Sequence, residues 1–73
     1  MPSSTVENYL KQIYLEQQPL GDDLLPMGRL ATAMAVTPGT ATTMIKALAE
    51  ANLVTYEPRT GVRLTRPGEQ LAL

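Results

Sequence analysis

The segment from Val36 to Leu53 constrains the fold most, because it has a defined start, a defined end and two different faces. Thr37 is suited to cap the start of a helix, and Pro38 fits the first helical position, where a missing N–H costs nothing. Asn52 stands where a left-handed cap would end the helix, with Leu53 able to fold back onto its last turn. The segment therefore predicts a single helix between Thr37 and Asn52.

The two faces of this helix differ in chemistry. Apolar residues at helical spacing form a stripe suited to burial, which consists of Ala41, Met44, Ile45 and Leu48. The opposite face is small and rich in hydroxyls, and it carries Gly39, Thr43, Lys46, Ala47 and Glu50, flanked by Thr40 and Thr42. Threonines are poor helix formers, and a purely structural surface would favour Glu, Lys or Gln. This composition therefore favours contact with a partner over a purely structural role. A helix end of this kind can lie in a DNA major groove.

Length and composition limit how the chain can be stabilised. Its 73 residues predict one domain, 1–73, and the absence of Cys and His excludes disulfides and a thiolate or imidazole zinc site. No apolar stretch approaches the roughly 20 residues of a membrane span, and the first residues lack the pattern of a signal peptide. A cytoplasmic location without a membrane partner is therefore expected.

Charge is distributed unevenly, although the net charge is only −1. Residues 1–25 carry one basic and four acidic side chains, whereas residues 26–68 carry five basic and two acidic ones. Positive charge thus collects around the predicted helix and the segment after it. This arrangement permits contact with an anionic partner but does not by itself identify one.

Two further helices are expected before the central one. A capping box formed by Ser4 and Glu7 begins a periodic apolar pattern, which predicts a helix over about 4–18. A shorter stripe predicts a second helix over about 27–35, after a short extended piece that ends before Pro26. Only a tight connection separates this helix from the next one, and the pair forms a helix-turn-helix pattern.

After Asn52 the apolar period changes to two. Residues 53–57 and 61–65 predict the two strands of a hairpin, with Arg59 at its tip and Arg63 on its return strand. Thr65 can cap a last helix that continues to the end of the chain. The expected fold is mainly α with a small β-hairpin: a winged helix-turn-helix with three helices, a two-stranded wing and the start of a fourth helix.

Several segments, in this order and spacing, resemble a known family. They are Thr5–Tyr14, Gly28–Ala31, Val36–Thr40, Leu48–Val54, Tyr56–Pro58, and Gly61–Thr65 with Gly68. Together they are similar to the N-terminal DNA-binding domain of the diphtheria-toxin-repressor family, the iron- and manganese-dependent bacterial repressors. The resemblance implies a reading head that binds double-stranded DNA at a near-palindromic operator. The full-length protein would act as a metal-loaded homodimer that represses metal uptake genes.

The resemblance also implies which side chains contact DNA. By position, it places four residues near bases or the adjacent sugar-phosphate: Thr37, Gly39, Thr40 and Thr43. It assigns phosphate contacts to Arg29, Thr42, Lys46, Arg59 and Arg63. Threonines offer hydroxyls to the backbone and a methyl to thymine, so direct base reading should be weak and DNA shape should contribute much of the selectivity.

The metal ligands of the family correspond only in part. Its first helix contributes two ligands at i and i+3, and this chain has Asn8 and Lys11 at those positions. An asparagine oxygen can coordinate a hard cation, whereas a charged lysine cannot. Asn8 is therefore one metal candidate, and Glu7 is a second one because it is adjacent to Asn8. Iron or manganese is expected for the full-length protein, and tight binding by this chain alone is not. A regulator that no longer senses metal is an alternative.

The sequence also bears on two other function classes. A winged helix can serve as a protein-interaction module, which predicts binding that survives high salt and ignores DNA. An enzyme is not expected, because no nucleophile–base constellation or phosphate-cradling loop occurs in the sequence. A domain this small is also expected to offer little concave pocket and to have no small-molecule substrate.

Overall fold

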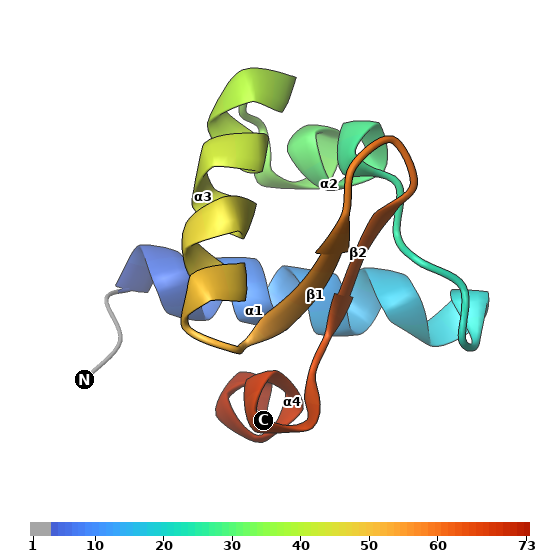
Figure 1. Ribbon diagram of the computed structural model, residues 1–73, viewed down its shortest axis with the longest axis vertical. Helices are drawn as coiled ribbons and strands as arrows, with labels where there is room; N and C mark the ends of the chain where they lie inside the picture. Colours follow the sequence, from blue (N-terminus) through green and yellow to red (C-terminus); the bar gives the residue numbers. More distant parts are fainter. Residues whose placement is uncertain (1–3) are drawn as a thin grey trace.

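Three α-helices, a two-stranded hairpin and a last α-helix follow one another in the computed structural model, which describes residues 4–73 and the side chains from residue 5 onward (Figure 1). The elements are α1 Ser4–Gln17, a 3-10 turn Gln18–Leu20, α2 Met27–Met34, α3 Pro38–Glu50, β1 Val54–Glu57, β2 Gly61–Leu64 and α4 Arg66–Ala72. This order confirms the winged helix-turn-helix fold, with α2 and α3 as the helix pair and β1–β2 as the wing.

Helix α3 begins and ends as its sequence predicts. The Thr37 side chain accepts a hydrogen bond from the Thr40 N–H at 3.2 Å, and Pro38 is the first helical residue. At the other end Asn52 is left-handed, with φ 62°, and the Leu53 N–H donates to the Leu48 carbonyl at 3.0 Å. This is the hydrogen-bond pattern of a Schellman cap, in which asparagine tolerates the left-handed backbone.

Helix α2 ends one residue earlier than predicted, and its end has the same kind of cap as the end of α3. Ala35 is left-handed, with φ 58°, and the Val36 N–H donates to the Ala31 carbonyl at 3.0 Å. The helix therefore closes with a second Schellman cap, which turns the chain sharply into α3. The predicted helix over about 27–35 is confirmed to within one residue, but its left-handed end was not predicted, because alanine is a strong helix former and gives no signal for a left-handed position.

Helix α1 ends at Gln17, within one residue of the predicted end, and a 3-10 turn that contains Pro19 follows it directly. Gly21 then reverses the chain with φ 63°, a backbone conformation that glycine adopts readily. Glu7 lies in the first turn of α1, as expected. The Ser4 side chain, predicted as the helix cap, lies outside the described residues.

The hairpin pairs Val54 with Leu64 and Glu57 with Gly61 in antiparallel register. The predicted short extended piece before Pro26 pairs with the hairpin at one residue: Leu25 exchanges backbone hydrogen bonds of 2.8 and 2.9 Å with Val62 of β2. Each strand is shorter than predicted by its outermost residue. Those residues serve the neighbouring helix ends instead: Leu53 closes the cap of α3, and the Thr65 side chain caps α4 by accepting from the Gly68 N–H at 3.2 Å.

The core lies between α1, α3 and the inner face of the hairpin. Its fully buried side chains are Leu10, Ile13, Leu25, Leu30, Ile45 and Val62. Helix α1 packs against α2, α4 and β2, and it crosses the whole domain in Figure 1. Within residues 4–73, no helix is long and apolar enough to span a membrane.

Candidate DNA-binding surface

Helix α3 presents the predicted outward face to solvent. The residues predicted to point outward are all exposed: Gly39, Thr43, Lys46, Ala47 and Glu50. On the opposite side Ala41, Ile45 and Leu48 are buried and Met44 is partly buried, so the stripe anchors the helix to the core. Thr37 and Thr40 are exposed, whereas Thr42 is half-buried. The N-terminal half of α3 therefore forms a projecting edge with short side chains.

Hydrogen bonds within α3 determine what its hydroxyls can still offer. The Thr37 hydroxyl donates to the Thr40 oxygen at 2.9 Å, which leaves the Thr40 hydroxyl hydrogen available to an acceptor outside the helix. The Thr43 hydroxyl donates back to the Gly39 carbonyl at 3.0 Å, as threonines within helices often do. Thr40 can therefore donate to a phosphate oxygen, whereas Thr43 offers an acceptor oxygen and a methyl group.

Gly39 makes the first turn of α3 open to close approach. A Cβ atom added at this position would meet nothing within 4 Å, so no packing inside the domain requires glycine here. Glycine in a helix costs up to about 1 kcal/mol relative to alanine. The helix thus carries a residue that weakens it without serving the core.

The tip of the hairpin lies at the same end of the domain as the N-terminus of α3 (Figure 1). A cavity of about 370 Å³ lies between the tip, the start of α2 and α3, and it is lined by Pro26, Met27, Gly28, Thr42, Tyr56, Arg59 and Thr60. Arg59 has a φ of 69°, and the Thr60 N–H donates to the Glu57 carbonyl at 3.0 Å. This is a turn that normally takes glycine or asparagine at the position of Arg59. The structure therefore brings Arg59 and Thr42 to one place.

Arg29 and Arg63 are held by other parts of the domain. Arg29 forms an ion pair with Glu16 of α1, with Nε 3.4 Å from the carboxylate oxygen. Arg63 donates to the Gly21 carbonyl and lies 4.0 Å from the Asp22 carboxylate. The sequence contains no signal for these partners, because they come from segments far from the arginines along the chain.

The residues of α1 do not fit a metal ion. Asn8 and Lys11, at the positions of the family's ligands, are both exposed, and Glu7 is half-buried beside them. Across residues 4–73, no three His, Cys, Asp or Glu side chains are grouped so that they could hold a metal. Iron and manganese sites need several such donors around one ion.

The short connection between two helices, the projecting helix and the adjoining wing define the class: a winged-helix DNA-binding domain. The sequence model of the iron-dependent repressor N-terminal DNA-binding domain matches residues 1–62. The chain therefore belongs to the iron-dependent repressor family, as its resemblance to the diphtheria-toxin-repressor domain indicated. Comparison with curated proteins gives no match.

Proposed function

We propose that this domain binds double-stranded DNA with α3 in the major groove and the hairpin tip against the adjacent backbone. Membership of a family of DNA-binding repressor domains supports the proposal. The observation that carries it is the exposed edge at the start of α3, where Gly39 and Thr40 project and no acidic side chain occurs in the first turn. Short side chains let the helix approach the floor of a groove, and a free hydroxyl can bind a phosphate oxygen.

The basic residues divide into two groups in this proposal. Lys46 and Arg59 are exposed and belong to no ion pair within the described residues, so both can contact phosphates at no cost to the fold. Arg29 and Arg63 would first have to leave the partners that hold them, and we assign them secondary contacts. Thr37, Gly39, Thr40, Thr42 and Thr43 complete the proposed surface.

We extend the proposal to a pair of domains on a near-palindromic site. One recognition helix buries little surface, and helix-turn-helix proteins reach specific affinity by placing two helices about one DNA turn apart. The matched family is one of iron-dependent repressors. We infer that repression of metal uptake genes by the dimeric full-length protein is the corresponding role of this chain. Metal control would then depend on residues other than Asn8 and Lys11.

The test is a fluorescence anisotropy titration with the domain fused to a dimerising coiled coil. A duplex enriched from a random library by this dimer should bind at least tenfold more tightly than random duplex. Lys46→Gln should weaken binding to both duplexes and reduce the salt slope by about one, because one phosphate contact is lost. Lys11→Gln, the same change on an exposed site of α1, should leave both unchanged.

Each outcome bears on the proposal. Equal binding to selected and random duplex would overturn the specific-DNA claim. Equal effects of Lys46→Gln and Lys11→Gln would show that net charge, and not docking of α3, determines affinity. Binding of a protein partner that resists high salt, without binding of DNA, would favour an interaction module instead.

A further inference from the structure

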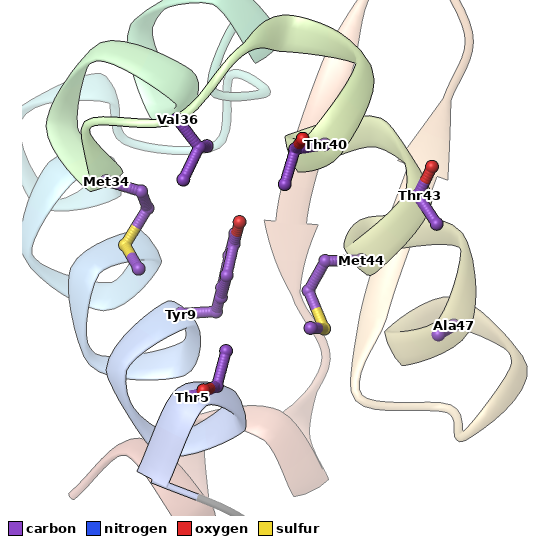
Figure 2. Close-up of a pocket in the computed structure, with 8 residues that line it drawn as sticks. All are labelled: Thr5, Tyr9, Met34, Val36, Thr40, Thr43, Met44 and Ala47. Atoms are coloured by element: carbon purple, nitrogen blue, oxygen red, sulfur yellow. The ribbon is translucent and has the colours of Figure 1, made fainter.

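A pocket of about 490 Å³ opens between the N-terminal half of α1, the turn after α2 and the side of α3 (Figure 2). Its lining consists of Thr5, Tyr9, Met34, Val36, Thr40, Thr43, Met44 and Ala47. Little concavity was expected in so small a domain, and that expectation was wrong. The lining residues Met34 and Val36 flank the Schellman cap at Ala35, and Met34 and Met44 contribute flexible side chains to the lining. The volume of the pocket lies within the range of ordinary small-molecule sites.

Tyr9 supplies an unusual feature of this pocket. Only 2% of the residue is exposed, and Figure 2 shows its hydroxyl oxygen directed into the space between Val36 and Thr40. Within residues 4–73 no group forms a hydrogen bond with this hydroxyl. No fully buried side-chain oxygen among those residues lacks a partner, so the Tyr9 hydroxyl oxygen is accessible to solvent, and Figure 2 shows it on the side of the pocket. Tyrosine hydroxyls at the edge of a protein core normally form a hydrogen bond, and a molecule that enters the pocket can supply the partner.

The lining determines what kind of molecule can enter. None of its eight side chains is charged, and apolar groups make up most of the surface. An ionised ligand would lose its hydration without gaining a counter-charge, which excludes phosphates and carboxylates. Met34 and Met44 lie on opposite sides of Tyr9 in Figure 2, and flexible thioethers adapt well to flat apolar molecules.

We propose that this pocket binds a neutral, mainly apolar small molecule with one hydroxyl or carbonyl oxygen, which forms a hydrogen bond with Tyr9. The ring or chain of the molecule lies against Tyr9, with Met34 and Met44 on either side. Its oxygen forms the hydrogen bond with the Tyr9 hydroxyl. The binding requires no reaction and no metal.

Such a ligand would also affect DNA binding, a consequence that rests on the proposed function. Thr40 and Thr43 line the pocket and belong to the proposed DNA surface. A molecule that contacts these two side chains changes the environment of the edge that enters the groove. The ligand would then act as an effector with a coupling of about five- to 150-fold on DNA affinity.

The experiment uses 2-naphthol as the probe and the 73-residue chain without DNA. In a methyl NMR titration, the resonances of Met34 and Met44 should shift saturably with 2-naphthol. Met27, which lines the other cavity, is the internal control and should not shift. Naphthalene-2-sulfonate, which has the same rings and a fixed negative charge, should bind at least tenfold more weakly.

Two variants locate the site. Tyr9→Phe removes only the hydroxyl, which has no partner in the described domain, so the fold should be unaffected and 2-naphthol should bind about three- to tenfold more weakly. Plain naphthalene should bind wild type and Tyr9→Phe equally. Ala47→Phe, on the exposed wall of the pocket, should abolish binding of both compounds while thermal unfolding stays that of a folded domain.

The outcomes separate this inference from the proposed function. No saturable shift up to the solubility limit of 2-naphthol would overturn the pocket proposal, whatever the DNA titrations give. Equal shifts of Met27 and Met44, or equal affinity for the sulfonate, would show nonspecific adsorption and would also overturn it. Saturable binding in a protein that ignores DNA would refute the DNA proposal alone.

Discussion

The base of the hairpin is fixed by several neighbours, whereas the turn residues Arg59 and Thr60 at its tip are exposed. At the base, Gln17 accepts a hydrogen bond from the Leu64 N–H at 3.1 Å, and Arg63 donates to the Gly21 carbonyl. The backbone of Gly68 lies directly against the carbonyl of Leu53. At the tip Arg59 is exposed and forms no ion pair within the described residues.

The two arginines of the hairpin show what this difference teaches. Arg63 uses its charge inside the domain, so it holds β2 to the loop before α2. Arg59 occupies a backbone conformation that favours glycine or asparagine, and its side chain serves no contact of the fold. A strained residue that does nothing for the fold points to a role in binding.

The largest effect is expected at the base, from Gly68→Ala. A Cβ atom there would overlap the Leu53 carbonyl and would also press on the Leu64 side chain, 3.3 Å away. Since the obstacle is backbone, either α4 or the end of α3 must move, and we expect a loss of about 3 kcal/mol. Urea unfolding followed by circular dichroism measures this loss.

The matched control is Gly39→Ala at the open end of α3, where the added Cβ meets nothing within 4 Å. This change should raise the free energy of unfolding by up to about 1 kcal/mol, because alanine is the better helix former. If both variants were equally stable, the contact between Gly68 and Leu53 would not constrain the fold, and base and tip would not differ as described.

A second large effect is expected from Gln17→Ala. Gln17 is only 2% exposed. Its side-chain amide oxygen accepts a hydrogen bond from the Leu64 N–H, and its side-chain amide nitrogen lies 3.5 Å from the Glu69 carboxylate. Removing the amide leaves the buried Leu64 N–H without an acceptor, which should cost about 2 kcal/mol. Native-state hydrogen exchange at the Leu64 amide should accelerate in parallel with the loss of stability.

The neighbouring glutamine provides the control for that prediction. Gln18 is exposed, and its side chain forms only a local hydrogen bond of 3.1 Å to the Tyr14 carbonyl. Gln18→Ala should therefore change stability by less than about 0.5 kcal/mol. A loss at Gln18 as large as that at Gln17 would mean that helix propensity, and not the link from α1 to the hairpin, determines the effect.

Local signals in the sequence predicted the elements well, because each depends on neighbours in the chain. The cap at Thr37, the left-handed Asn52 and the Thr65 cap were all predicted from residue types at fixed spacing, and the structure confirms them. The two faces of α3 follow from periodicity alone. The left-handed Ala35 could not be predicted in this way, because its conformation is imposed by the packing of α2 against α3.

Long-range partners could not be predicted from the sequence, and they decide which candidate residues are free. Nothing in the pattern indicates that Glu16 pairs with Arg29 or that Gly21 binds Arg63, since each pair joins different elements. The same limit applies to Gln17 and to the pocket around Tyr9, which exist only once α1, α3 and the hairpin meet. The assignment of the candidate residues to DNA stays a prediction.

The smallest effect is expected at the tip, from Arg59→Asn. Asparagine tolerates a φ of 69° better than arginine does, so the fold should gain about 0.5 kcal/mol. DNA affinity should fall several-fold, with a smaller salt slope, because one phosphate contact is lost.

Arg63→Gln is the matched control at the base, and its effect on stability should have the opposite sign. It should cost about 0.5 to 1 kcal/mol of stability and weaken DNA binding less than Arg59→Asn does. Urea unfolding and anisotropy on the same two variants decide the matter, because a stability loss at Arg59 or a larger DNA defect at Arg63 would reverse the roles assigned to tip and base.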